Sequence, residues 1–274
     1  MRFCLESILA MYYKYLKLIH KPLLAVMKNT RDFDLQIIDG NNLPDYSPVI
    51  YVVNHTNSHD IPVASEVIKK HHNVLLGKQP LKIIDRIAFC LNGVIWVDRK
   101  NRFSKHNAKS EIIKCLNNKT NILMFPEGTW NRSDNKIMLP LYWGCVDIAK
   151  SCNVPICPII LDYTPKVCYA KVGKPIVINE TESKQTAINH IRDEMATLRW
   201  EIWEKQSILK RDELSNDYYK KILQHDADEY PKINLEYESS VVRKEHLEYC
   251  EVFAHLNQIV PNFKTAFLFG ENIK

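Results

Sequence analysis

Short apolar runs rich in β-branched residues alternate with helix-length segments from residue 35 to residue 206, and this alternation indicates the fold class. The expected strands are Leu35–Ile38, Pro48–Asn54, Asn73–Gly77, Gly93–Val97, Asn121–Phe125, Val154–Leu161, Cys168–Val172 and Ile176–Ile178. The expected helices are 63–70, Leu81–Leu91, Lys105–Asn117, Tyr142–Cys152 and Ser183–Gln206. Strands that alternate with helices are typical of βαβ units. The sequence therefore predicts an α/β domain with a largely parallel central sheet flanked by helices.

The composition is that of a folded protein. Among the 274 residues, 46% are hydrophobic and 25% are charged, which is enough apolar material for a sizeable core. The eight cysteines form no CxxC pair and no His/Cys spacing of the kind that binds zinc. We therefore expect reduced thiols in a cytoplasmic compartment and no metal site.

The first 28 residues have the clearest helical periodicity. Apolar side chains recur at spacings of four and three and form one stripe: Leu5, Leu9, Tyr12, Leu16, Ile19 and Leu23. The longest uncharged stretch, Ser7–Tyr13, is far shorter than the roughly 20 apolar residues of a spanning helix. Pro22 is expected to divide the segment into two short helices. The stripe either packs on the protein's own core or lies in a membrane interface, and the sequence leaves both open.

Charge is distributed unevenly along the chain. Residues 1–200 have a net charge of +9, and residues 201–274 have a net charge of −4. A basic body suggests an anionic partner such as phospholipid head groups, whereas no nucleic-acid-binding motif accompanies the cations. We expect three parts: amphipathic membrane-associating helices at 1–28, an α/β domain at 29–205 and a small acidic helical extension at 206–274.

His55 and Asp60 are the first candidate catalytic residues. His55 directly follows the expected strand Pro48–Asn54, at the carboxyl edge where α/β sheets bind ligands. Side chains five residues apart lie about 140° apart on a helix, so the two can meet only if the intervening turn is not helical. An aspartate on one ring nitrogen leaves the other free as a general base, although a merely structural polar pair is also compatible with the sequence.

The chain offers no nucleophile to accompany this histidine. It contains no G-x-S-x-G motif, and no cysteine is paired with His55. A His–Asp pair is then better suited to deprotonating a bound hydroxyl than to forming a covalent intermediate.

Two further segments lead to the same edge of the predicted sheet. Arg99 and two more cations, Lys100 and Arg102, follow the strand Gly93–Val97, and a guanidinium fork suits phosphate. A solvated basic loop is the alternative. The strand Asn121–Phe125 runs directly into Pro126-Glu127-Gly128-Thr129, which brings a carboxylate and free backbone N–H groups to the edge.

Four blocks appear in order with helix-sized gaps: HTNSHD at 55–60, GVIWVDR at 93–99, FPEGT at 125–129 and VPICPII at 154–160. In these blocks the chain resembles the glycerolphosphate and lysophosphatidate acyltransferase family over roughly residues 30–205. The resemblance implies an O-acyltransferase that moves a fatty acyl group from acyl-CoA or an acyl carrier protein to 1-acylglycerol-3-phosphate. It implies no cofactor beyond that donor, and a peripheral place on the cytoplasmic face of the membrane.

The resemblance also implies roles for individual residues. His55 would take the proton from the acceptor hydroxyl, and Asp60 would orient it. Arg99 would contact the acceptor's phosphate. Glu127 and Gly128 would position its glycerol, and Thr129 would shape the turn. The wall for the acyl donor or acyl chain would include Pro155.

The chain departs from the family pattern after Thr129. Many members carry arginine at the next position, whereas this chain has Trp130 and its next cation is Arg132. Either Arg132 replaces that arginine, or the acceptor is a glycolipid, an amine lipid or another lysophospholipid. A non-catalytic membrane-binding protein of the same fold is the third possibility.

Overall fold

The computed structural model describes residues 2–28, 31–56, 58–78, 83–131, 137–164 and 166–206. Within this part of the chain, seven strands form one sheet in the order β1-β7-β6-β2-β5-β3-β4. They are β1 (Asp34–Ile38), β2 (Ile50–Val53), β3 (His72–Gly77), β4 (Val94–Val97), β5 (Asn121–Met124), β6 (Ile156–Tyr163) and β7 (Val167–Val172). Every neighbouring pair is parallel except β6 and β7. The predicted α/β class with a largely parallel sheet is confirmed.

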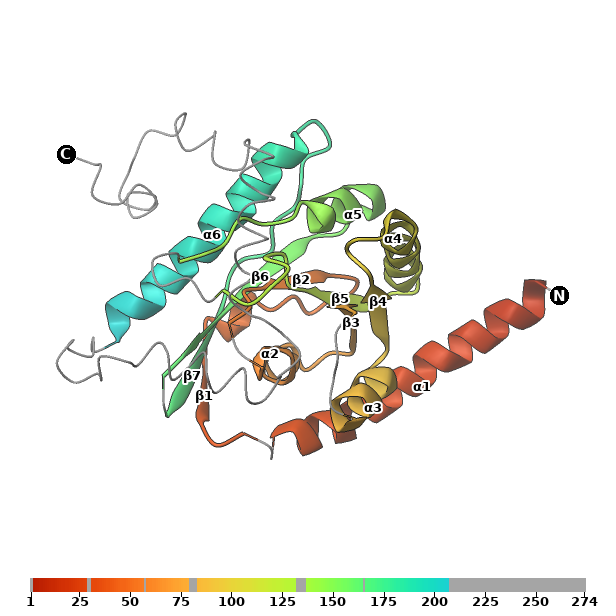
Figure 1. Ribbon diagram of the computed structural model, residues 1–274, viewed down its shortest axis with the longest axis horizontal. Helices are drawn as coiled ribbons and strands as arrows, with labels where there is room; N and C mark the ends of the chain where they lie inside the picture. The colour runs from red at the N-terminus through yellow and green to blue at the C-terminus, as the bar shows by residue number, and fades with distance from the viewer. Residues whose placement is uncertain are drawn as a thin grey trace.

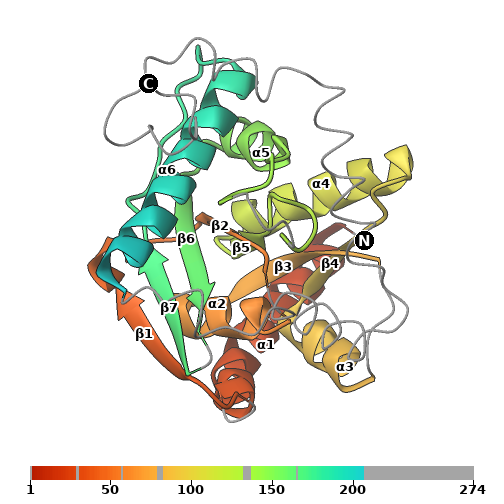
Figure 2. The same ribbon diagram turned by 60° about the vertical axis from the view of Figure 1, so that its left-hand side comes forward.

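Helices cover both faces of this sheet (Figure 1). They are α1 (Arg2–Lys28), α2 (Asp60–Ile68), α3 (Ile83–Asn92), α4 (Arg102–Asn117), α5 (Gly144–Cys152) and α6 (Lys184–Lys205), with a short 3-10 turn, η1 (Gly40–Asn42). α4, α5 and α6 lie on one face, and α1, α2 and α3 lie on the other (Figures 1 and 2). The result is a three-layer α/β domain.

The central strands are apolar on both faces because both are covered. All four residues of β2 are buried, and so are all four of β5. Ile50 and Val52 pack with the α4–α6 layer, whereas the alternate residues Tyr51 and Val53 pack with α2. Continuous apolar runs of this kind are typical of buried parallel strands.

The strand order brings the carboxyl ends of β2 and β5 side by side. These two strands pair in parallel, with Ile50 opposite Ile122 and Val52 opposite Met124. The chain reaches β3 and β4 before it returns to β5, and then crosses to β6 on the other side of β2. The segments that follow β2 and β5 therefore meet at a point where the topology changes direction, a common place for ligand sites.

α1 corrects one expectation, because it is a single helix from Arg2 to Lys28 that contains Pro22. Pro22 is exposed, and the turns before it are anchored by the buried side chains of Leu16 and His20. Packing on one face thus holds the helix together where a proline removes one backbone hydrogen bond. Among the described residues, none of the helices combines the length and the apolar character needed to cross a bilayer.

The expected strand Ile176–Ile178 is also wrong. Only Ile176 pairs, through an isolated antiparallel bridge to Ile156, with N–H···O distances of 2.9 and 2.7 Å. Ile156 is the first residue of β6, so the strand offers no further residues with which a ladder could continue. The expected acidic extension lies outside the described residues beyond Gln206.

Candidate active site

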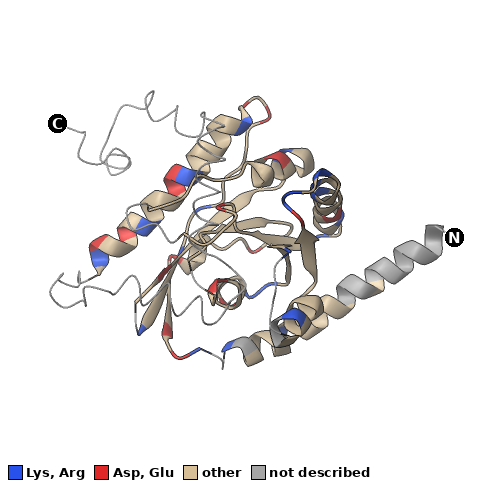
Figure 3. Cartoon of the chain, in the orientation of Figure 1, with Lys and Arg blue, Asp and Glu red and all other residues tan. Residues whose placement is uncertain are grey.

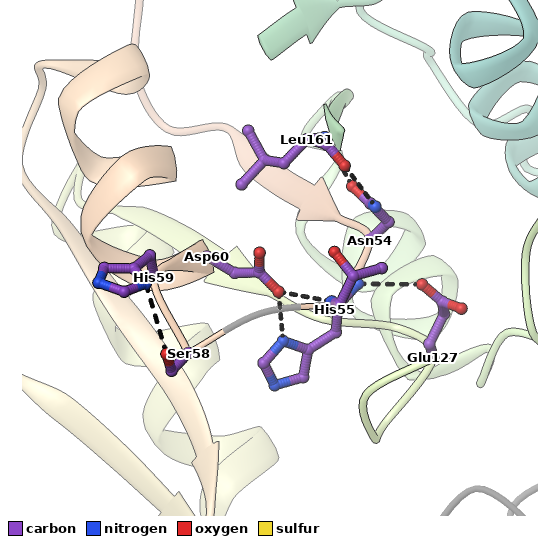
Figure 4. Close-up of polar contacts among 8 residues, drawn as sticks. Asn54, His55, Ser58, His59, Asp60, Glu127 and Leu161 are labelled. Carbon is purple, nitrogen blue, oxygen red and sulfur yellow. Dashed lines mark hydrogen bonds and ion pairs between the residues drawn. The ribbon is translucent and has the colours of Figure 1, made fainter. Parts of the chain in front are cut away.

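His55 and Asp60 meet at the carboxyl end of β2 (Figure 4). His55 Nδ1 lies 2.7 Å from Asp60 Oδ2, and the same oxygen accepts a 2.6 Å hydrogen bond from the backbone N–H of Thr56. Asp60 is fully buried, whereas the side chain of His55 is 15% exposed. The carboxylate accepts the Nδ1 proton, so Nε2 keeps its lone pair on the side of the ring away from Asp60.

The turn between these residues is not helical, as the contact requires. Helix α2 begins only at Asp60, with His59 at its N-cap and no side-chain hydrogen bond from that cap. The N-cap residue is thus His59, and Asn57 lies outside the described residues. In place of a cap, the Asp60 carboxylate holds the Thr56 N–H and so closes the turn around the histidine.

Glu127 fixes the backbone of His55. Its Oε1 accepts the His55 N–H at 3.0 Å, and its Oε2 accepts the Leu139 N–H at 2.8 Å. The carbonyl of His55 in turn accepts the Asn131 N–H at 2.6 Å. The segment after β5 therefore binds both backbone polar groups of the candidate base.

Glu127 itself is inaccessible, with 0% of its surface exposed. Burial raises the pKa of Glu127 to about 7, and the two backbone N–H donors act in the opposite direction. Because both oxygens are engaged by backbone groups, this geometry gives Glu127 a positioning role. Direct contact with the acceptor's glycerol stays a prediction that the burial of Glu127 does not favour.

Gly128 makes the turn after β5 possible. Its φ of +74° lies in the left-handed region, and an added Cβ would stand 2.6 Å from the Tyr142 ring and 3.1 Å from the Arg99 guanidinium. Both the backbone conformation and the space therefore require glycine. Thr129, the next residue, is buried in the same turn, and its role in shaping the turn stays a prediction.

Arg99 reaches this turn from two strands away. It follows β4, and its guanidinium donates a hydrogen bond to the carbonyl of Gly128. On the way the side chain crosses the end of β3, where a Cβ at Gly77 would lie 3.2 Å from the Arg99 guanidinium. Arg99 remains exposed, so the predicted cation is accessible to solvent beside the turn that contains Gly128. Further cations continue along α4 (Figure 3).

Two aromatic rings flank the imidazole of His55. The Phe125 ring lies 4.5 Å from it at an interplanar angle of 33°, and the Trp130 ring lies 5.6 Å away, nearly edge-on at 83°. Trp130 is buried, at 8% exposure. The residue that departs from the family pattern thus contacts the candidate base, whereas Arg132 lies outside the described residues.

Sequence reasoning missed Asn54 and misplaced Pro155. Asn54 Nδ2 donates to the Leu161 carbonyl at 2.9 Å and its Oδ1 accepts the Leu161 N–H at 2.7 Å, which joins the end of β2 to β6 (Figure 4). A polar residue directly before the HTNSHD block was the available signal. The Pro155 carbonyl accepts the Ile50 N–H at the start of β2, so Pro155 lies at the opposite edge and lines no wall beside His55.

This site and fold define a class: a three-layer α/β domain with a His–carboxylate pair and an arginine at one sheet edge. A family model described as Acyltransferase matches residues 34–162. The solved structure of the 1-acyl-sn-glycerophosphate acyltransferase PlsC from Thermotoga maritima has the same fold, with a TM-score of 0.56 and 19% identity. That match covers 76% of this chain and 100% of the other.

Curated relatives agree with the family match. The 1-acyl-sn-glycerol-3-phosphate acyltransferase of Haemophilus influenzae is 36% identical over 121 residues, covering 43% of this chain and 49% of the relative. The enzyme of the same name from Escherichia coli is 33% identical over 139 residues, covering 49% and 56%. The chain thus spans about half the length of these relatives. Over these residues the chain is similar to lysophosphatidate acyltransferases.

Proposed function

We propose that this protein transfers a fatty acyl group from a thioester to the free hydroxyl of 1-acylglycerol-3-phosphate, which yields phosphatidic acid. The observation that carries this proposal is the 2.7 Å contact between His55 Nδ1 and Asp60, because it engages one ring nitrogen and puts Nε2 on the side of the ring away from the carboxylate. The names of the curated relatives support the acceptor class.

In the proposed reaction, His55 Nε2 removes the proton from the acceptor hydroxyl as its oxygen attacks the thioester carbonyl. Asp60 stabilises the imidazolium that forms. Collapse of the tetrahedral intermediate breaks the carbon–sulfur bond, and the departing thiolate takes the proton from the imidazolium. The products are an ester and a free thiol, and His55 returns to its neutral form.

Two buried thiols, Cys145 and Cys157, are poorly suited to forming an acyl-enzyme. Burial raises the pKa of Cys145 to about 12 and that of Cys157 to about 12. A thiol with such a pKa is protonated at neutral pH and is a poor nucleophile. The acyl donor is a thioester of either CoA or an acyl carrier protein, and it is the only other reactant that the scheme needs.

Arg99 is the proposed contact for the acceptor's phosphate. One of its N–H groups is engaged by Gly128 O, which fixes the guanidinium at the rim while its other donors remain available. Lys100 is exposed beside it. The turn after β5 holds both the Arg99 guanidinium and, through Glu127, the backbone of His55. A phosphate bound by Arg99 would therefore lie at a fixed position relative to His55.

We further propose that the protein binds peripherally to the cytoplasmic face of a membrane through α1 and α3. These two helices pack together and expose large apolar side chains, with Leu18 at 76% and Ile83 at 78% exposure. Exposed apolar residues on adjacent helices favour an interfacial position. The six described cysteines are free thiols, which supports a reducing compartment.

The second candidate function is the same acyl transfer to a different acceptor lipid. The contact between Trp130 and His55 favours this candidate. Incubation of the purified protein with a labelled acyl thioester and a membrane lipid extract, followed by mass spectrometry of the products, tests both. Phosphatidic acid as the main labelled product supports the proposal, and another acylated lipid supports the second candidate. Vesicle binding without consumption of any donor would indicate a non-catalytic protein and would contradict both.

A further inference from the structure

Arg199 lies on α6, a helix that contains none of the four sequence blocks and follows the residues matched by the family model, 34–162. α6 packs along β6, on the sheet face to which Ile160 points (Figures 1 and 2). Asp162, two residues further along the strand, faces the same side because side chains alternate. Arg199 Nε donates a 3.2 Å hydrogen bond to Asp162 Oδ1. The guanidinium is therefore bound at the carboxyl end of β6, the strand beside β2.

The same guanidinium also binds the segment 137–141, which precedes α5. Arg199 Nη1 donates a 2.6 Å hydrogen bond to the carbonyl of Ile137. The arginine side chain is only 15% exposed, and its guanidinium carbon lies 5.2 Å from the centroid of the Trp203 ring, one turn further along α6. A planar fork with several donors can hold two acceptors at once. Arg199 thus joins the end of β6 to the segment 137–141.

The segment 137–141 leads back to His55 through Glu127. Two residues after Ile137, the Leu139 N–H donates to Glu127 Oε2 at 2.8 Å, and Glu127 Oε1 accepts the His55 N–H at 3.0 Å. Burial raises the pKa of Glu127, and the two backbone donors and the positive charge of Arg199 act in the opposite direction. Arg199 therefore supports the ionised Glu127 as well as the backbone that binds it.

The end of β6 leads back to His55 as well. Asp162 directly follows Leu161, whose backbone N–H and carbonyl are both bound by the side chain of Asn54 at 2.7 and 2.9 Å. Asn54 directly precedes His55. The two branches form a closed circuit of hydrogen bonds that begins and ends at His55, and Arg199 is the residue that joins them.

We infer that Arg199 is a positioning residue that closes this circuit and so holds His55 where it meets Asp60. A catalytic group that is misplaced by about 1 Å can lose most of its rate advantage, and backbone contacts on both sides of the base prevent such a shift. The inference rests on the proposed function for its catalytic consequence, whereas the circuit itself can be tested without turnover.

A double variant tests the catalytic consequence. Loss of the cation alone would leave the buried Asp162 carboxylate without its ion-pair partner, so Arg199→Met is combined with Asp162→Asn. Asp162→Asn alone is the matched control, because its amide oxygen can still accept from Arg199 Nε. In steady-state assays the double variant is expected to have a kcat roughly tenfold below the control, with KM for both substrates within about twofold. Equal kcat in the two proteins, or an effect confined to KM, would contradict the inference.

Two more variants separate positioning from a general loosening of α6. Arg199→Lys keeps the positive charge but lacks the planar fork, so we expect its kcat to fall between those of the wild type and the double variant. Lys171→Met removes another buried cation that ties α6 to the sheet, through Glu201 at 3.2 Å, but it touches no member of the circuit. It is expected to keep the kcat of the wild type. A wild-type kcat in Arg199→Lys, or an equal loss in Lys171→Met, would contradict the inference.

Backbone hydrogen exchange, followed by mass spectrometry, tests the circuit without catalysis. The Leu139 N–H is held by the buried Glu127 carboxylate, so its exchange reports on the opening of this contact. The peptide that contains residues 137–141 is expected to exchange about tenfold faster in the double variant than in Asp162→Asn, and peptides from β1 are expected to be unchanged. Equal exchange of residues 137–141 in both proteins would overturn the role of Arg199. Absence of transferase activity in the wild type would instead refute the proposed function, so the two failures are distinguishable.

Discussion

Glu127 accepts a 3.0 Å hydrogen bond from the backbone N–H of His55, 72 residues earlier in the chain. Two segments that are distant in sequence are thereby joined at the carboxyl ends of β2 and β5. The Glu127 carboxylate therefore fixes the backbone position of His55, the candidate base. This relationship leads to the first prediction.

Glu127→Gln is expected to destabilise the fold and to lower kcat. An amide side chain keeps only one acceptor, so one of the two buried N–H groups, of His55 or Leu139, loses its partner. The expected cost is about 2 kcal/mol of unfolding free energy, measured by denaturant titration. The control is Glu194→Gln on the exposed face of α6. A rise in the acceptor's KM without loss of stability would show that Glu127 contacts the acceptor after all.

Trp130→Arg is expected to destabilise the protein, although it introduces the residue that many members of the acyltransferase family carry at this position. Trp130 is buried against the His55 ring, so an arginine would place a charge in an apolar site or expel the segment. We expect a loss of about 2 kcal/mol or more of stability and a lower kcat. Trp200→Arg, at an exposed position of α6, is the matched control. Unchanged stability with a lower KM for lysophosphatidate would contradict this account of Trp130.

Stability is expected to fall on acidification because of three buried histidines at the opposite edge of the sheet. The rings of His71 and His72 lie 5.4 and 5.2 Å from that of His20. Burial lowers the pKa of His71 to about 4 and that of His72 to about 3, and it also lowers the pKa of His20. The unfolded chain then binds more protons than the folded one below about pH 6.5. Stabilisation by these neutral rings is full above that pH and is lost as the pH falls toward 4.

The difference between wild type and His71→Gln isolates this effect. The raised pKa of Glu127 makes the free energy of unfolding change with pH in the opposite direction over part of the same pH range. This contribution is present in both the wild type and His71→Gln, so it cancels in their difference. As the pH falls from 6.5 to 4, the free energy of unfolding of the wild type is expected to decrease by about 1.4 kcal/mol per pH unit more than that of the variant. His106→Gln, exposed on α4, is expected to behave as the wild type. Parallel curves for wild type and His71→Gln would show that His71 titrates normally.

The apolar surface of α1 and α3 is expected to mediate vesicle binding. Leu18→Glu and Ile83→Glu each replace a highly exposed apolar side chain by a charge, and each is expected to weaken partitioning onto anionic phospholipid vesicles roughly tenfold. Val177→Glu is the control, because Val177 is equally exposed, at 74%, but lies outside both helices. Equal loss in all three variants would point to charge alone, and no loss in the first two would contradict the membrane surface.

Much of the fold could be predicted from sequence because local patterns determine it. Seven of the eight expected strands formed within a few residues of the expected bounds, and the His–Asp contact followed from the non-helical turn before α2. Pro22 misled the prediction because packing of Leu16 and His20 outweighs one lost backbone hydrogen bond.

The internal role of Glu127 was not predictable. It depends on which strand lies beside β2 and in which register, and the spacing of residues in the chain carries no such information. The same holds for Arg99, which reaches Gly128 only because β3 between them ends at Gly77. A contact between residues on different strands can be predicted only when the order of the strands in the sheet is known. The strand order is seen only in the folded structure.

The most direct test of the central claim compares His55→Ala with His106→Ala in a single assay of thiol release and phosphatidic acid formation. Acyl-CoA and acyl carrier protein thioesters serve in turn as donors, with lysophosphatidate as the acceptor. His55→Ala is expected to lose activity by a factor on the order of 10³ while its thermal unfolding stays cooperative, and His106→Ala is expected to match the wild type. Equal turnover by His55→Ala and the wild type would contradict the assignment of His55 as the general base.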